Sequence, residues 1–367
     1  MTAPATMPAT APVVLGAGPA GCAAAIVLAR SGAEPLLIDR DAEVGDALCG
    51  GFMSWRTAAT TRKLGIDLEQ LGAQRVTALR LFAGRRFAQS ALPEPAYGLS
   101  RRGFDSALRR TAVAAGARLE VDTIRALAPG CASGESREYR SDSLFLASGK
   151  HDLRGATRPR GARDPALGLR LRIAPDPQLT ALIGETIELH LFAGGYAGIV
   201  LQEDGSANIC LALRKSLLAR AGNDPAQLLD LLAGESESFA ARLQFAPANP
   251  RVDTIAAVPY GWIAQDTAPG LFRLGDQAAV IPSLAGEGMS IAIASGMAAA
   301  QAWQQGGGGA APAYQQTFAR RARRPVRVAE AIWQLAEREL GGHALTQIAR
   351  SVAPAARLAM RLSRIAA

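Results

Sequence analysis

The sequence predicts an α/β protein with a Rossmann-like unit first, a β-sheet-rich region in the middle and a helical region at the end. Residues 12–40 have the pattern of a strand, a glycine turn, a helix and a second strand, which together form a βαβ unit. Residues 167–259 alternate apolar and polar positions, for example from Ile187 to Leu191, as antiparallel strands do. After Pro282 the pattern becomes helical and continues into an arginine-rich tail.

Length and composition permit a large core. The chain has 367 residues, of which 49% are hydrophobic, so it can bury one large core or form two domains that share a cleft. The formal net charge is +8, and lysine occurs only at Lys63, Lys150 and Lys215, so arginine supplies nearly all of the basic residues. These arginines are scattered and are not interleaved with aromatic residues, which argues against a nucleic-acid-binding surface.

The four cysteines lie far apart in the sequence, at Cys22, Cys49, Cys131 and Cys210. Their spacing fits neither a metal site nor a redox dithiol, so we expect reduced thiols, no metal and a cytoplasmic protein. Residues 1–10 lack the basic and apolar segments of a signal peptide, and we expect a flexible tail there. Residues 13–29 are apolar, but their glycines favour a buried strand, turn and helix over a membrane span.

The first candidate ligand-binding motif follows the first predicted strand: Gly16-Ala17-Gly18-Pro19-Ala20-Gly21. Gly16 permits the tight turn, Gly18 lets the backbone approach a pyrophosphate, and Gly21 lets the helix pack closely on the sheet. The N-terminus of that helix then faces the phosphates, and Pro19 suits its first turn. The motif therefore predicts a dinucleotide-binding site.

The residue that ends the second strand narrows the choice of dinucleotide. Asp39 lies at the distance from the glycine turn at which a carboxylate accepts a hydrogen bond from an adenosine ribose hydroxyl. Its neighbour Arg40 could pair with a 2′-phosphate, but an acidic residue at the strand end favours an unphosphorylated ribose. FAD or NAD is therefore expected at this site in preference to NADP.

A second motif decides between FAD and NAD: Leu274-Gly275-Asp276-Gln277-Ala278-Ala279, followed by Pro282 and by Gly286-Glu287-Gly288-Met289 at the start of a helix. It resembles the Gly-Asp segment of the flavoprotein superfamily that contains aromatic hydroxylases, flavin halogenases and geranylgeranyl reductases. The resemblance implies that Asp276 binds the ribityl chain of FAD and that Pro282 lies beside the reactive edge of the isoalloxazine. The following helix would point its N-terminus at N1 and O2, where reduced flavin carries negative charge.

Other stretches extend this resemblance over most of the chain. Arg101 resembles the arginine of an Arg-x-x-Phe-Asp helix start that reaches the cofactor, with Arg102 as the competing assignment. Val121 occupies the place where these proteins hold adenine through backbone groups. Ala147-Ser148-Gly149 resembles their Ala-Thr-Gly turn, and Cys49-Gly50-Gly51 resembles the loop that lies along the flavin in geranylgeranyl reductases.

The resemblance also implies how the domains are divided. The expected FAD-binding domain is of the glutathione-reductase type and is assembled from discontinuous segments. The expected boundaries are 11–75, 98–160 and 265–310 for this domain, 76–97 and 161–264 for a β-sheet-rich substrate domain, and 311–367 for a C-terminal helical region.

Departures from the family pattern guide the functional prediction. Tyr196 alone remains of the Tyr-x-Trp-x-Phe-Pro signature of the reductases, which argues against an isoprenoid reductase and leaves Tyr196 as the candidate substrate-binding residue. A second Rossmann fingerprint is missing, so NAD(P)H is expected to act as a transient reductant, as it does in the hydroxylases. The first hypothesis is therefore hydroxylation of an aromatic or polyketide-type small molecule through a flavin C4a-hydroperoxide, with Pro282 and Cys49 as candidate catalytic residues.

Two alternatives stay open. One is a reductase, similar to geranylgeranyl reductase, that reduces C=C bonds in a lipid or isoprenoid; the Cys49 loop supports it. The other is a non-catalytic, flavin-bound interaction protein.

The arginine-rich tail has a helical pattern with a basic face and an apolar face. Arg350, Arg357, Arg361 and Arg364 fall near one helical face, beside an apolar stripe of Leu358, Leu362 and Ile365. This pattern predicts either a helix that docks its stripe on the protein or weak contact with an anionic membrane surface. Pro354 is expected to interrupt the helix.

Overall fold

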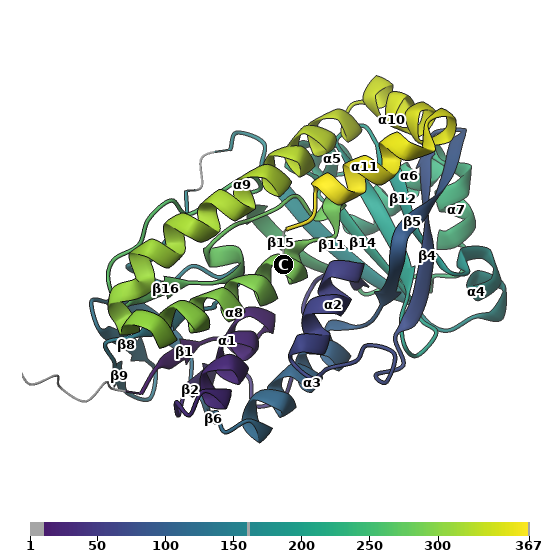
Figure 1. The fold of residues 1–367 in the computed structure, drawn as a ribbon. Coiled ribbons are helices and arrows are strands. Elements are labelled where there is room, and N and C mark those ends of the chain that lie inside the picture. The colour runs from purple at the N-terminus through teal and green to yellow at the C-terminus, as the bar shows by residue number, and fades with distance from the viewer. Residues whose placement is uncertain (1–10, 160–161, 366–367) are drawn as a thin grey trace, which may run out of the picture.

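The computed structural model describes residues 11–159 and 162–365, so the tail predicted at residues 1–10 lies outside the described residues. Two large β-sheets form the frame, and long helices run across both of them (Figure 1). In the described ranges no helix is long and apolar enough to cross a membrane.

The first sheet is parallel, with the strand order β16-β10-β1-β2-β6. Its strands are β1 (Val13–Leu15), β2 (Leu36–Asp39), β6 (Arg118–Val121), β10 (Leu144–Leu146) and β16 (Leu271–Arg273). Helix α1 (Pro19–Arg30) joins β1 to β2, which confirms the predicted βαβ unit. The chain leaves this sheet and returns to it three times, so its strands come from widely separated segments.

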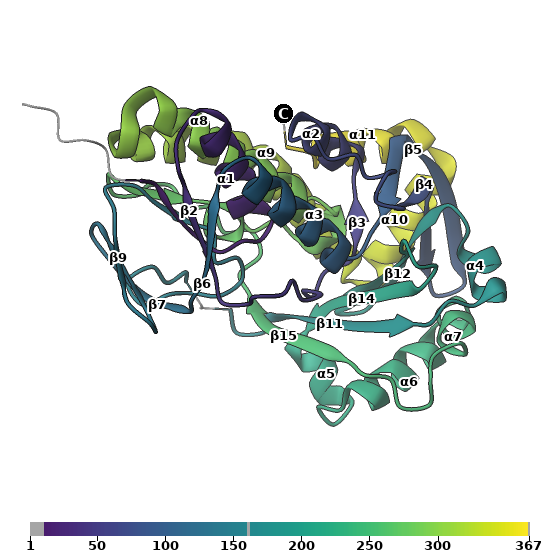
Figure 2. The same ribbon diagram turned by 90° about the horizontal axis from the view of Figure 1, so that it is seen from below.

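Both faces of the parallel sheet are covered, which is why its central strands are continuous apolar runs. On one face Val14 and Leu37 pack against α1, α3 (Arg101–Ala114) and α8 (Gly288–Gly306). On the other face Val13 and Ile38 pack against a small antiparallel sheet, seen from below in Figure 2. Its strands are β7 (Ile124–Ala128), β8 (Cys131–Gly134) and β9 (Glu138–Arg140).

The second sheet is mixed, with the order β15-β11-β14-β13-β12-β4-β5-β3. Its strands are β3 (Phe52–Met53), β4 (Gln74–Ala83), β5 (Arg86–Gly98), β11 (Ala166–Ile173), β12 (Thr186–Phe192), β13 (Gly195–Leu201), β14 (Ala207–Arg214) and β15 (Asp253–Val258). Neighbours pair antiparallel except β12 and β4, which run parallel. The alternation around Ile187 therefore predicted β12 and its neighbours correctly, whereas four helices between residues 177 and 243 were not predicted.

The two faces of the mixed sheet have different partners. One face packs against helices α4 (Pro177–Ile183), α5 (Lys215–Arg220), α6 (Pro225–Glu235) and α7 (Glu237–Leu243). That face also holds His190, which is buried, stacks on Phe82 and lies 3.4 Å from Glu188. Burial lowers the pKa of His190, and this histidine is a structural residue away from the cavity described below.

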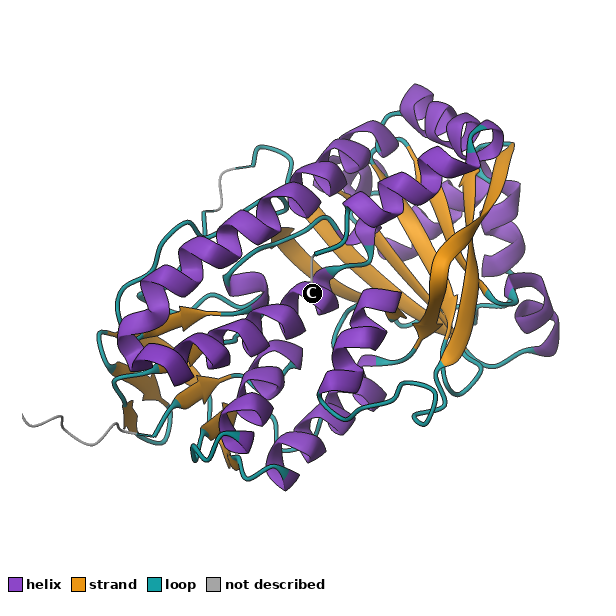
Figure 3. Ribbon diagram, viewed as in Figure 1, coloured by secondary structure: helices purple, strands orange, loops and turns teal. Residues whose placement is uncertain are grey.

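Helices of the C-terminal region cover the opposite face of the mixed sheet (Figure 3). They are α9 (Ala311–Ala336), α10 (Glu339–Ser351) and α11 (Ala353–Leu362), and α2 (Trp55–Lys63) lies near the end of α11. Short 3-10 turns occur at η1 (Gly275–Gln277), η2 (Ser283–Ala285) and η3 (Gly307–Ala310). The break between α10 and α11 falls just before Pro354, as the sequence predicted.

A buried ion pair fastens the end of α11 to the start of α8. Arg364 lies 3.2 Å from Glu287, and both side chains are almost fully buried. The Arg364 guanidinium also lies over the Trp55 ring and donates to the carbonyl of Ala285. Burial raises the pKa of Glu287 and lowers that of Arg364, so each charge depends on the other.

We predict that Arg364→Ala destabilises the protein by about 3–5 kcal/mol at neutral pH, because it leaves the Glu287 carboxylate buried without its counter-charge. The folded-state pKa of Glu287 is raised, so protonation favours the folded state, and this contribution is lost as the pH rises through that pKa. The deficit should therefore shrink as the pH falls. Urea unfolding at several pH values tests this, with the exposed Arg361→Ala as the control. A deficit that does not change with pH would contradict it.

Candidate active site

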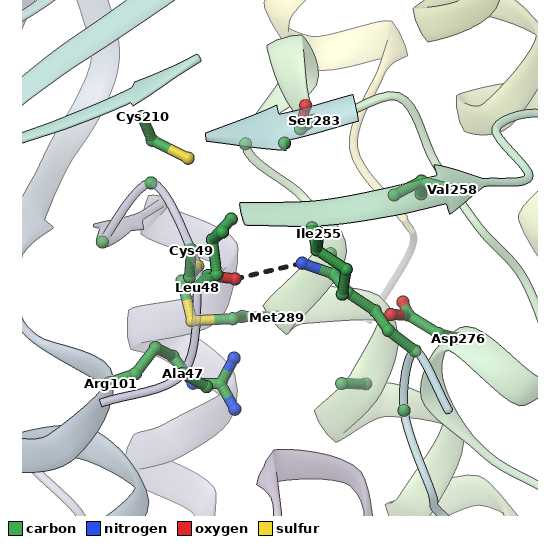
Figure 4. Close-up of a pocket in the computed structure, with 18 of the residues that line it drawn as sticks. Ala47, Leu48, Cys49, Arg101, Cys210, Ile255, Val258, Asp276, Ser283 and Met289 are labelled. Carbon is green, nitrogen blue, oxygen red and sulfur yellow. Dashed lines mark hydrogen bonds between the residues drawn. The ribbon is translucent and has the colours of Figure 1, made fainter. Parts of the chain in front are cut away.

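A cavity of about 1550 Å³ lies between the carboxyl ends of the parallel strands, the mixed sheet and the C-terminal helices. Ligand pockets typically enclose about 300–1,000 Å³, so this one has room for a cofactor and a second molecule. Figure 4 shows part of it, with residues from the Cys49 loop, β14, β15 and the segment around Asp276 converging on one space.

The first motif forms one end of the cavity. Gly16, Gly18, Pro19 and Ala20 line it, whereas Gly21 does not. A Cβ on Gly21 would overlap the carbonyl oxygen of Gly16, which is the close packing predicted for that position. A Cβ on Gly18 would meet only Arg101 Nη2, at 3.9 Å, so Gly18 borders open space at the N-terminus of α1.

Asp39 is fixed at the tip of β2. Its carboxylate accepts hydrogen bonds from the backbone nitrogens of Ala17, at 2.6 Å, and Asp41, at 3.0 Å. The guanidinium of Arg109 lies 3.3 Å from the same carboxylate. Sequence reasoning missed Arg109, because it lies on α3 and no local motif links it to β2.

The neighbours of Asp39 complete this end of the cavity. Arg40 lines it and lies 3.5 Å from His151, whose pKa is lowered by burial and by that arginine. Val121 is 49% exposed and does not line the cavity. The next two residues, Asp122 and Thr123, line it instead.

Arg101 and Arg102 both line the cavity, but only Arg101 is held rigidly. Two of its nitrogens donate to Asp105, at 2.8 Å and 2.6 Å. Burial opposes its charge, yet Asp105 and the nearby Cys49 thiol raise its pKa above the ordinary value. Arg101 is therefore a fixed positive charge facing Gly18.

The Cys49 loop is tethered to the mixed sheet and to the turn after β10 by ion pairs and hydrogen bonds. Arg170 and Arg172 each lie 2.8 Å from Asp46. Lys150 donates to the carbonyl of Leu48 and Asn208 to that of Cys49, both at 3.0 Å. Cys49 and Gly50 line the cavity, and Cys210 faces it from β14, as Figure 4 shows. The sequence did not single out Cys210.

The Ala147-Ser148-Gly149 turn and the second motif form the middle of the cavity. All three turn residues line it, as do Gly275, Asp276, Gly286, Gly288 and Met289. Gly275 and Gly286 have positive φ angles, which explains why glycine occupies those positions. Pro282 is buried and does not line the cavity, whereas its neighbour Ser283 does.

Three hydroxyl groups meet beyond this motif. The Tyr196 hydroxyl lies 2.9 Å from Ser283 Oγ, and the Tyr260 hydroxyl lies 2.8 Å from the same atom. Trp333 packs edge-on against both tyrosine rings. Burial raises the pKa of both tyrosines, so their hydroxyls stay protonated. Tyr196 was predicted from sequence; Tyr260 and Ser283 carried no signal there.

The far part of the cavity, which we call the apolar chamber, has walls from β4, β5, β12 and helices α9, α10 and α11. Every described lining residue from these six elements is apolar. The wall from β12 comprises Ile187, Leu189 and Leu191, and that from α11 comprises Ala355, Ala356, Ala359 and Met360.

The residues at the motif end of the cavity fit FAD. The open space at Gly18, the N-terminus of α1 and the guanidinium of Arg101 would accommodate a pyrophosphate. Asp39 would accept from the ribose, and Asp276 would bind the ribityl chain. The N-terminus of α8 would face the pyrimidine side of the isoalloxazine.

We predict that Gly18→Val abolishes FAD retention but leaves the Tm of the FAD-free protein unchanged, because its side chain would enter the open space that the pyrophosphate needs. Asp276→Ala should weaken FAD binding at least about fivefold, since one lost hydrogen bond costs about 1–3 kcal/mol. Gly234→Val, at another open position but far from the cavity, is the control. FAD titration followed by fluorescence measures all three, and an unchanged Kd for Gly18→Val or Asp276→Ala would refute the assignment.

Comparisons with known proteins agree with this geometry. Residues 9–127 match the family described as FAD binding domain. Digeranylgeranylglycerophospholipid reductase 1 of Methanothermobacter thermautotrophicus is 26% identical over 315 residues, which cover 79% of this chain and 75% of that protein. Menaquinone reductase of Mycobacterium tuberculosis is 29% identical over 315 residues, with the same two coverages.

Solved structures share the fold. PqsL of Pseudomonas aeruginosa, in complex with 2-aminobenzoylacetate, has a TM-score of 0.77 at 15% identity, covering 92% of this chain and 99% of that one. A geranylgeranyl bacteriochlorophyll reductase-like protein of Thermoplasma acidophilum has a TM-score of 0.74 at 20% identity, covering 96% and 95%. The motifs, the cavity and these matches together identify an FAD-dependent oxidoreductase, which is similar in sequence to lipid and quinone reductases and shares the fold of the solved structures named above.

Proposed function

We propose that the protein reduces C=C bonds in a lipid with a long apolar chain, with NAD(P)H as the source of electrons. The observation that carries this proposal is the apolar chamber, whose described walls on β4, β5, β12 and α9–α11 contain no polar side chain. Two relatives of the chain are named as reductases of digeranylgeranylglycerophospholipid and of menaquinone, which supports the same substrate class.

The chamber suits a chain better than a small polar ring. Burial of apolar surface contributes about 0.8 kcal/mol per CH₂ group, so a long hydrocarbon gains binding energy along the whole wall. The charged lining residues lie elsewhere, mostly around the motif end and the Cys49 loop, for example Asp39, Arg101 and Arg170. A substrate with an apolar tail therefore has a place in the cavity separate from that of FAD.

Reduction of a C=C bond adds a hydride to one carbon and a proton to the other. FAD supplies the hydride when it is bound and reduced. The proton must come from a group that stays protonated and lines the cavity, and we propose Tyr260 for this role. Ser283 connects Tyr260 to Tyr196, so a proton that Tyr260 loses can be replaced along these hydroxyls, and solvent must return one proton to the cluster before the next turnover.

The Cys49 thiol is the second candidate proton donor. It lines the cavity, and the backbone of its loop is held by Asn208 and Lys150. The loop thus has a fixed position between the motif end of the cavity and the mixed sheet.

Hydroxylation of a phenolic substrate is the second candidate function. The cluster of Tyr196, Ser283 and Tyr260 favours it, because hydroxyl groups can bind a phenol oxygen by hydrogen bonds. The sequence favours this hypothesis, and it remains a prediction.

Product mass separates the two functions. We predict that a polyprenyl lipid stimulates NADH or NADPH oxidation and gains two hydrogens, whereas phenols stimulate little oxidation. Mass spectrometry of the product after incubation with the FAD-loaded protein measures this. A gain of one oxygen in a phenolic substrate, with no reduced lipid, would replace reduction by hydroxylation.

Variants distinguish the two proton donors. If Tyr260 donates, Tyr260→Phe should lower kcat at least about a hundredfold with little change in KM, in line with the usual contribution of general acids. Cys49→Ala should then retain most activity per bound FAD. A large loss of activity in Cys49→Ala with little loss in Tyr260→Phe would instead identify Cys49 as the proton donor. FAD content of each variant is the control, because equal loss of FAD would show a structural role only.

A further inference from the structure

Exposed apolar side chains gather on the C-terminal helices. Eight large hydrophobic residues are exposed in the described ranges, and five of them come from residues 335–358: Leu335, Leu340, Ile348, Val352 and Leu358. Leu340 is 81% exposed and Leu358 is 56% exposed. Single exposed apolar residues need no explanation, but a gathering of this kind marks a surface that contacts something apolar.

A hairpin tip extends this surface. Phe87, at the start of β5, is 46% exposed. It lines a shallow surface hollow together with Arg86, Gln347 and Arg350, so the tip of the β4–β5 hairpin adjoins α10. Figure 1 shows α10 and α11 in yellow on the outside of the molecule, beyond β5.

The two helices turn different faces inward. Helix α10 buries Gly341, Gly342, Thr346 and Ala349 and leaves Leu340 on the outer side. Helix α11 lines the chamber with Ala355, Ala356, Ala359 and Met360, so its outer side carries Arg357, Leu358 and Arg361. The predicted stripe is thus divided, since Ile365 is buried in the core and Leu358 faces outward.

Exposed arginines lie on the same two helices as these apolar residues and at the turn between β4 and β5. Arg85, Arg86, Arg350, Arg357 and Arg361 are all exposed, and none forms an ion pair with a carboxylate among the described residues. We call these five arginines, with Phe87, Leu340, Val352 and Leu358, the C-terminal patch. It combines unpaired positive charge with apolar side chains, which is complementary to the surface of an anionic bilayer.

We propose that the C-terminal patch docks the protein on an anionic membrane. This inference rests on the proposed function: a lipid substrate resides in the bilayer, so an enzyme that reduces it must reach the membrane surface. The inner sides of the same two helices line the apolar chamber, and Ile348 both lines it and is 45% exposed. Docking through α10 and α11 would therefore place the chamber next to the membrane, so that an apolar chain need not cross water.

Sedimentation of the FAD-loaded protein with vesicles tests the proposal. The probes are vesicles of phosphatidylcholine alone and of equal parts phosphatidylcholine and phosphatidylserine, at low and high salt. The protein should sediment with the anionic vesicles at low salt and be released at high salt, because the Debye length falls from about 10 Å at 0.1 M to about 3 Å at 1 M.

A triple variant locates the surface. Arg357→Gln, Leu358→Ser and Arg361→Gln together should weaken vesicle binding at least about tenfold, since each arginine near the surface contributes about 1 kcal/mol. The control changes an arginine–valine surface at α3 and β6 that is also exposed: Arg110→Gln, Val113→Ser and Arg118→Gln. It should bind like the unchanged protein.

Three results would overturn the proposal: no preference for the anionic vesicles, binding that ignores salt, or equal loss of binding in the control. A stable dimer that covers the patch and excludes vesicles, seen by light scattering, would also overturn it. The proposed function is tested separately, because lipid reduction can be assayed in detergent without a membrane. In that assay the triple variant should reduce lipid at the same rate as the unchanged protein.

Discussion

Close backbone contact between β1, α1 and α8 is the constraint on which the rest of the molecule depends. A side chain at Gly21 would overlap Gly16, and one at Gly296 would overlap the carbonyl of Ala20. Glycine and alanine at these positions let the two helices approach each other and the sheet. Their N-termini consequently open on the same cavity, so two partial positive charges face its interior before any charged side chain is counted.

The cavity divides into two chemically different parts because different elements build them. Strand ends, turns and helix N-termini form the first part, where backbone groups and fixed charges such as Arg101 are available to a dinucleotide. Pleated strands and helix flanks form the second, where side chains alone reach the space and nearly all are apolar. The Cys49 loop and the Tyr196–Ser283–Tyr260 cluster lie at the boundary between them.

Features encoded by local pattern could be predicted from the sequence. The βαβ unit and the strands around Ile187 follow from glycine spacing and hydrophobic periodicity, and the structure has all three elements of that unit. The choice of FAD over NAD followed from the resemblance of the segment around Asp276 to flavoproteins. Tyr260, Arg109 and the Arg364–Glu287 pair could not be predicted in this way. Each meets its partner only after distant segments fold together, and a single tyrosine or arginine has no spacing that marks it.

The strand order of the parallel sheet has a consequence for modularity. The segment that matches the FAD binding domain family, residues 9–127, holds β1, β2 and β6 but neither β10 nor β16. In the intact chain β1 lies at the centre of the sheet, with β10 hydrogen-bonded along one edge. In an isolated 9–127 segment, this edge of β1 would have no strand to pair with. An unpaired strand edge can act as a template for aggregation. The matched segment therefore depends on residues beyond it to pair this edge, through long-range strand pairing of the kind that slows folding.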